Sequence, residues 1–165
     1  MSWTEHARAL VAYNWWANRK ILDAAAGLSR EELDRNTGAT FRSIGANLRH
    51  QASVEMGWHS VLAEIELQRP EGLQAEASME DIRSWFEESR KRLGEYAAGL
   101  TDTSMDTELT AARGGETHRW PAWQVLAHLM NHSAHHRAET GVALAAAGHS
   151  PGDMDLIYFV AEHKA

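Results

Sequence analysis

Histidine spacing is the feature that most restricts how this chain can fold. The stretch from Ala127 to Glu139 contains four of the ten histidines, and His128, His132 and His136 follow one another at intervals of four residues. Residues four apart lie above one another on one face of an α-helix. Two imidazoles placed in this way can bind one metal ion. The spacing therefore predicts a long helix with a metal-binding face.

A helical wheel sorts the polar residues of this stretch. With 100° per residue, His128 and His136 lie about 40° to either side of His132. Glu139 shares this face with apolar residues, whereas His135 points away from it and is expected to be peripheral. A purely structural role explains such a row of histidines poorly. Histidine has a low helix propensity, and burying an unpaired imidazole costs desolvation free energy. The pattern therefore favours a ligand role for at least two of them.

A third nitrogen ligand can come from His50, which lies at the edge of the apolar stripe of another predicted helix. Three protein ligands leave one coordination position open, which is the form of a catalytic metal site. The chain has no cysteine, so any metal must be bound by nitrogen and oxygen. Neutral imidazoles suit Zn²⁺, Ni²⁺, Cu²⁺ and Fe²⁺, and the order of affinities does not choose among them.

Apolar periodicity predicts an all-α fold in one domain over residues 1–165. Four long amphipathic helices are predicted over residues 3–26, 43–67, 78–99 and 121–147. We expect them to form an antiparallel four-helix bundle with a short hairpin, turning at Gly114-Gly115, before the last long helix. A capping box at Ser29 predicts a short helix. Residues 68–73 are predicted as a connector, and residues 153–160 as an ordered tail whose apolar side chains need cover.

Composition excludes several classes of function. The net charge of −7, without a basic run, argues against a nucleic-acid partner. The chain has neither a signal pattern nor an apolar run of membrane-spanning length, so we expect no membrane association and a cytoplasmic location. A di-iron carboxylate site needs two Glu-x-x-His units, and a serine hydrolase of the α/β class needs a Gly-x-Ser-x-Gly turn. The sequence contains neither pattern.

Several segments, in order along nearly the whole chain, resemble the DinB family of metal-binding four-helix proteins. The similar segments are Tyr13–Asn18, Phe41–Ile44, Leu48–His50, Glu55–Trp58, Leu126–His132, His135–Arg137 and Gly148–Asp155. This resemblance implies a bundle of the DinB/YfiT-like type with His50, His132 and His136 as metal ligands, and gives His128 a role beside them. The usual His-Arg-Gly-Gln run reads His136-Arg-Ala-Glu139 here, so Glu139 is a candidate fourth ligand, hydrogen-bond acceptor or base.

The resemblance also implies a function. Relatives include transferases and isomerases that use small cellular thiols, so we expect a metal-dependent enzyme with Zn²⁺ or Ni²⁺ first, and Fe²⁺ next, as its metal. Because the chain has no cysteine, the low-molecular-weight thiol would be a co-substrate, with Glu139 or His128 moving protons. Metal-dependent hydrolysis is the nearest variant. A non-catalytic metal-binding stress protein and a bundle with purely structural histidines are the alternatives, and a homodimer is expected.

The remaining polar residues have ordinary roles in this interpretation. We expect Arg137 to form an ion pair at the surface or beside the site. Glu55 is expected to bond locally, and His59 to be solvated. The tryptophans other than Trp3 are expected to be packing residues, with the lining of a cleft by one or two of them as the alternative. Trp3 and Ile65 belong to the inner stripes of their predicted helices.

Overall fold

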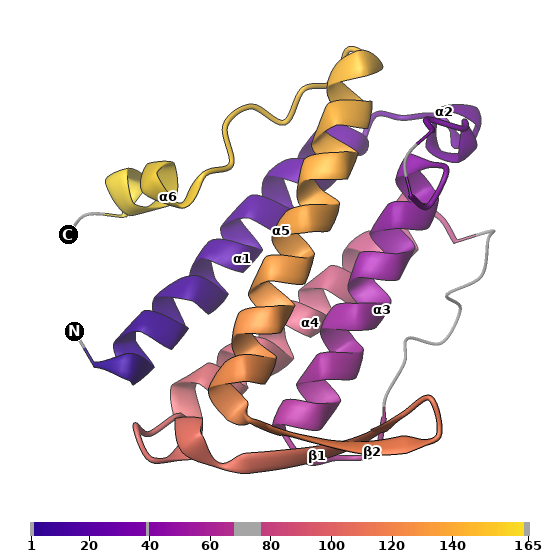
Figure 1. Ribbon diagram of the computed structural model, residues 1–165. Helices are drawn as coiled ribbons and strands as arrows, with labels where there is room; N and C mark the ends of the chain where they lie inside the picture. Colours follow the sequence, from indigo (N-terminus) through magenta and orange to yellow (C-terminus); the bar gives the residue numbers. More distant parts are fainter. Residues whose placement is uncertain (1, 39, 68–76, 164–165) are drawn as a thin grey trace.

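Four long helices make up most of the protein, and the computed structural model describes residues 2–38, 40–67 and 77–163 (Figure 1). The long helices are α1 (Trp3–Ala25), α3 (Ile44–Leu62), α4 (Met79–Gly99) and α5 (Ala122–Ala146). The shorter elements are α2 (Arg30–Asp34), the 3₁₀ helix η1 (Ser104–Asp106), β1 (Glu108–Arg113), β2 (Glu116–Pro121) and α6 (Leu156–Glu162). The mostly helical fold predicted from periodicity is confirmed, whereas the connector predicted over 68–73 lies outside the described residues.

Serine residues begin four of the helices. Ser2, Ser29 and Ser78 each accept a hydrogen bond from the backbone of the third helical residue, whose own carboxylate accepts one in return. Ser43 caps α3 in the simpler way, through the backbone N–H of Ala46. These caps satisfy backbone donors that have no partner inside the helix. The capping box predicted at Ser29 is confirmed.

The long helices pack in a ring of neighbours. α1 contacts α4 and α5, and α3 contacts the same two helices from the other side. The antiparallel hairpin of β1 and β2, joined at Gly114-Gly115, lies across one end of the helices (Figure 1). Both of these glycines have positive φ, which favours glycine. This hairpin was predicted from the paired glycines. None of the described helices combines the length and the apolar character needed to cross a membrane.

The core has a polar layer between two apolar clusters. One cluster lies towards the hairpin and includes Leu93 and Leu129, and the other lies towards α2 and includes Leu48 and Phe86. The buried polar residues between them are Asn14, Asn18, Gln51, Glu55, Ser89, Ser133 and Arg137. Every long helix contributes to this layer, which is therefore a shared feature of the four helices.

The polar layer corrects two expectations from the sequence. The Glu55 carboxylate is buried and accepts hydrogen bonds from α1, α4 and α5, so its partners are not only local. Arg137 is also buried rather than at the surface. It donates to the side-chain oxygens of Asn14 and Asn18. The sequence did not reveal these positions as buried, because their partners belong to other helices. His59, which we expected to be solvated, is buried as well.

α3 ends five residues earlier than periodicity predicted. After Leu62 the chain forms a Schellman motif, in which the N–H of Ile65 donates to the carbonyl of Ser60 over 3.0 Å and Glu64 has a φ of 52°. A glycine usually adopts this conformation, and its absence hid the helix end. Ile65 is consequently exposed, as is Trp3 at the start of α1, so neither side chain belongs to an inner stripe.

The C-terminal segment is ordered, but its apolar residues are poorly covered. Residues 156–162 form α6, which rests on α1 through Phe159. The exposed apolar side chains are Leu156, Ile157, Tyr158 and Val160. Within the described chain, the expectation that the apolar residues of this tail need cover is therefore met at Phe159 and, in part, at Met154, which packs against two of the core clusters.

Candidate metal centre

Three histidines from two helices converge at one point beside the polar layer. His50 comes from α3, and His132 and His136 come from successive turns of α5. One ring nitrogen from each lies within 4.8 Å of the others. Because α3 and α5 pack against each other, the helical spacing in α5 and the position of His50 together produce a three-nitrogen cluster.

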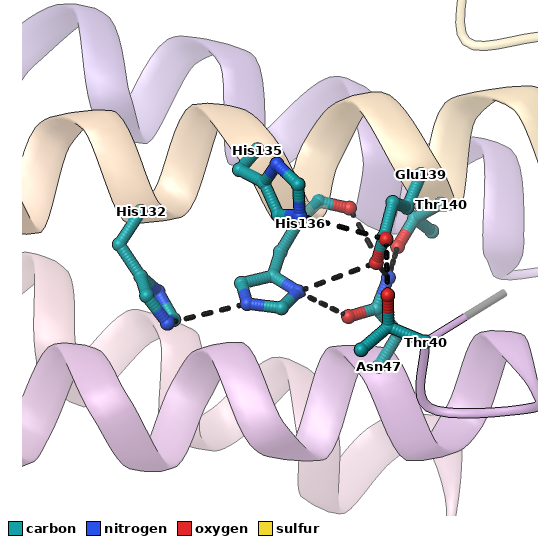
Figure 2. A network of polar contacts seen from close by, with 7 residues as sticks. All are labelled: Thr40, Asn47, His132, His135, His136, Glu139 and Thr140. Atoms are coloured by element: carbon teal, nitrogen blue, oxygen red, sulfur yellow. Dashed lines mark hydrogen bonds and ion pairs between the residues drawn. The ribbon is translucent and has the colours of Figure 1, made fainter.

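The rings are oriented toward a common centre. The Nε2 atoms of His132 and His136 are 3.2 Å apart (Figure 2). The ring centroid of His50 lies 4.7 Å from that of His136 and 5.4 Å from that of His132. Ring nitrogens at these separations can bind one ion after small side-chain movements, since imidazole nitrogens lie about 2.0–2.1 Å from a bound Zn²⁺.

The charge state of the cluster suits metal binding. Burial, with the neighbouring histidines, lowers the pKa of His132 and of His136 to about 4, and burial also lowers the pKa of His50. Imidazoles with lowered pKa values are neutral at pH 7, so each has a nitrogen lone pair available. These residues therefore meet the chemical requirement for nitrogen ligands without first releasing a proton at that pH.

Asn47 fixes the tautomer of His136. The Oδ1 atom of Asn47 lies 2.6 Å from Nδ1 of His136, while its Nδ2 donates to Oγ1 of Thr140 over 3.0 Å and to the carbonyl of His136 over 3.3 Å (Figure 2). Because the amide nitrogen of Asn47 donates to the His136 carbonyl and the Thr140 hydroxyl, its amide oxygen is the group that faces the His136 ring. This oxygen accepts a hydrogen bond from Nδ1–H of His136. Nε2 of His136 therefore has its lone pair directed at the cluster, an arrangement typical of metal-ligating histidines.

Glu139 lies on the Nδ1 side of the His136 ring, away from the cluster, which is on the Nε2 side. Its Oε2 atom is 3.6 Å from Nδ1 of His136, on the side of the ring that also faces Asn47 (Figure 2). Its Oε1 atom accepts a hydrogen bond from Thr40 over 2.6 Å and lies 3.5 Å from Nε2 of His135. Among the described residues, the group of converging ligand atoms consists of the three histidines without Glu139.

Comparison with protein-family models matches residues 1–164 to the DinB family. The chain belongs to the DinB family. No curated protein matches the chain. Family membership and the cluster of His50, His132 and His136 both fit the binding of a divalent metal ion. The resemblance noted from the sequence is thereby confirmed for the family.

Phe41 forms one wall of this DinB centre. Its ring stacks on that of His50, with centroids 3.9 Å apart and an interplanar angle of 20°. The centroid of the Phe41 ring also lies 5.3 Å from that of His136. Phe41 lies in the loop before α3, where Arg42 has a φ of 65° and Ser43 then caps the helix. An aromatic face against two rings of the cluster limits their rotation and excludes water from that side.

His128 and His135 lie outside the three-nitrogen cluster on opposite sides. His128 is exposed, and its ring centroid is 5.8 Å from that of His132 and 4.9 Å from that of Trp58. We had expected His128 to share the buried face, so its exposure is a correction. His135 is exposed, as its wheel position predicted.

Sequence reasoning missed Asn47 and Phe41 as parts of the site. Asn47 stands three residues before His50, so both side chains lie on neighbouring positions of the helix face that packs against α5. A polar amide in an otherwise apolar stripe was the available signal. Phe41 precedes the helix, and no periodicity could place it against His50.

We expect Asn47→Ala to weaken metal binding without removing it. The change deletes the acceptor that orients His136, and the loss of such a supporting residue typically costs roughly 10–100-fold in metal affinity. Competition with a chelating dye would measure the dissociation constant, and metal content at saturation should stay near one ion per chain. Asn131→Ala, at an exposed position of α5, is the control. An Asn47→Ala affinity equal to that control would show that the contact does not orient a ligand.

Proposed function

We propose that this DinB-family protein is a metal-dependent enzyme that uses a low-molecular-weight thiol as co-substrate. His50, His132 and His136 would hold the divalent ion, with Zn²⁺ or Ni²⁺ as the first candidates and Fe²⁺ next. The single observation behind this proposal is the set of three neutral imidazoles with converging nitrogens. Three protein ligands leave a coordination position for an exchangeable molecule.

From family membership we further propose that the four long helices form the antiparallel bundle of DinB proteins and that residues 1–165 are a single domain. We also propose that the protein is a cytoplasmic homodimer. Metal-dependent hydrolysis is the nearest enzymatic variant, and a non-catalytic metal-binding stress protein is the alternative outside catalysis.

The chemistry divides between the ion and the chain. A divalent ion held by His50, His132 and His136 would lower the pKa of a thiol at this position, so that a nucleophile would be available at neutral pH. The thiol has to come from a second molecule, because the chain contains no cysteine. His128, one helical turn before His132, is then the proposed acceptor of the thiol proton. Glu139 is proposed to act through His136, since it lies on the Nδ1 side of that ring.

In the reaction we propose, the thiol S–H bond breaks and its proton passes to His128. The sulfur then uses that S–H electron pair to form a bond to an electrophilic carbon. The bond between this carbon and its leaving group breaks, and its electron pair departs with the leaving group. The protein is not consumed, because the proton held by His128 is released to solvent or to the leaving group. No oxidant or reductant is needed.

A thioether assay tests the proposal. Protein purified without a histidine tag and loaded with Zn²⁺ or Ni²⁺ should accelerate the reaction of 2-mercaptoethanol with 1-chloro-2,4-dinitrobenzene, followed by absorbance. A chelator should remove the acceleration, and His128→Ala should lower the rate by roughly 100-fold or more, with unchanged metal content. Stoichiometric metal without acceleration for any of several small thiols would instead favour the non-catalytic protein.

A further inference from the structure

An open cavity of about 320 Å³ lies beside the histidine cluster, between α3, α5 and the hairpin. His50 and His132 form part of its wall, so the cavity reaches two of the three proposed ligands. His136 is buried and does not line it. A molecule in this cavity would therefore approach the cluster from the side of the hairpin, away from Glu139 and Asn47.

Two tryptophans and His128 form the aromatic part of the wall. The rings of Trp58 and Trp120 meet edge to face, with centroids 5.9 Å apart, and Trp58 contacts His128 in the same manner at 4.9 Å. Trp58 comes from α3 and Trp120 from β2, so the hairpin brings the second indole to the site. The same three residues also line a smaller neighbouring cavity of about 290 Å³.

Among the described residues, the cavity wall contains three histidines but no Lys, Arg, Asp or Glu. Ser53 is its one hydroxyl, and the other lining residues are the two tryptophans with Val, Leu, Ala and Gly. A carboxylate or phosphate placed against the indoles, away from the cluster, would lose water without gaining a cationic side chain as a partner. An apolar ring would instead exchange water for indole faces and edges. The wall therefore favours an uncharged ligand.

The size of the cavity limits that ligand further. Ligand-binding cavities generally range over about 300–1,000 Å³, and this one is at the lower end of that range. One substituted ring, or an aliphatic group of similar bulk, would fill it. A large charged thiol could reach the cluster only with most of its polar part outside the cavity.

We infer that this cavity binds the uncharged, apolar part of a substrate, typically one aromatic ring, with its reactive atom directed at His50 and His132. Trp58 and Trp120 determine the preference, and His128 lines the same cavity beside Trp58. This inference rests on the proposed function, because a metal ion at the cluster defines where the reactive atom lies.

Three thiols of matched reactivity test the inference on Co²⁺-loaded protein. The probes are phenylmethanethiol, 4-(mercaptomethyl)benzoic acid and 2-mercaptoethanol, and thiolate-to-cobalt absorption reports their binding. We expect phenylmethanethiol to bind about 10-fold or more tightly than 2-mercaptoethanol, because its ring leaves water. The carboxylated probe should lose that advantage. Equal affinities for the three thiols would overturn the inference.

Variants assign the preference to the indoles. Trp120→Ala and Trp58→Leu should bring phenylmethanethiol close to 2-mercaptoethanol in affinity, while cobalt content and 2-mercaptoethanol binding stay unchanged. Trp123→Ala is the matched control, because Trp123 is exposed near the start of α5 and does not line the cavity. If circular dichroism shows either variant folded and the ring preference persists, the assignment is wrong.

A second measurement separates this inference from the proposed function. Benzyl alcohol added to metal-free protein should shift the indole N–H signals of Trp58 and Trp120 in NMR spectra, whereas benzoate should not. Shifts of these signals in a protein that fails to bind cobalt would refute the metal-dependent function and support the cavity as a binding site for an apolar ring. Cobalt binding with no such shifts, and no preference among the thiols, would refute the inference about the cavity and leave the metal-dependent function supported.

Discussion

His136→Ala should abolish stoichiometric metal binding. The change removes the most buried of the three converging imidazoles, and two remaining nitrogens cannot complete the three-ligand set of such a site. The fall in affinity should exceed the roughly 10–100-fold that replacement of a supporting residue causes. Metal analysis of untagged protein after dialysis, together with calorimetric titration, would measure both quantities.

His135→Ala is the matched control for this prediction. His135 is the neighbouring residue of the same helix and is exposed, so its removal changes the histidine count without changing the cluster. We expect it to retain about one ion per chain. Comparable metal loss in the two variants would point to non-specific binding by surface histidines. Full metal retention in His136→Ala would refute the three-histidine site.

Arg137→Met should lower the free energy of unfolding more than any other single substitution proposed for this protein. The Arg137 guanidinium is buried against Asn14 and Asn18, whose amide groups in turn donate to the Glu55 carboxylate. Burial lowers the pKa of Arg137, and the charge of Glu55 opposes that change. Removing the cation leaves a buried anion without compensation, which typically costs about 3–5 kcal/mol. Urea unfolding would measure the free energy of unfolding.

Two further variants test the cause of that loss. Arg83→Met breaks an exposed ion pair with Asp23 and should cost less than about 1 kcal/mol. Arg137→Met combined with Glu55→Gln removes both buried charges, so it should be more stable than Arg137→Met alone. A double variant that is as unstable as the sum of the single changes would show that charge compensation is not the reason, and that lost packing of the long side chain is.

The polar layer also bears on the metal centre. Ser133 donates to Glu55 over 2.8 Å and stands between His132 and His136 in α5. The same carboxylate accepts from Gln51, which follows His50 in α3. The layer therefore fixes the position of α3 along α5 at the level where the three histidines meet. A rigid support of this kind keeps the geometry of the cluster independent of small movements elsewhere.

Local patterns were sufficient to predict most of the secondary structure. Helical periodicity gave the long helices, the Ser29 capping box gave α2, and the paired glycines gave the hairpin, because each signal lies within a few residues of the element that it specifies. Prediction failed where the usual signal was missing. α3 ends at a Schellman motif with Glu64 in place of glycine, so apolar spacing continued past the true end.

By itself, the sequence determined the face of α5 on which His132 and His136 lie. His132 and His136 meet because residues four apart on any α-helix are neighbours, and the wheel position of His135 was sufficient to exclude it from that face. Tertiary structure alone decided the rest: the approach of Asn47 to His136, the exposure of His128 beside Trp58, and the burial of Glu55 with Arg137. A helical pattern specifies the direction in which each side chain points around the helix axis. How deeply that side chain is buried, and which residue of a neighbouring helix it meets, depend on packing between residues distant in the sequence. For this reason the histidine-bearing face of α5 could be predicted from spacing, whereas the cavity beside it and the buried charges of the polar layer could be found only from the fold.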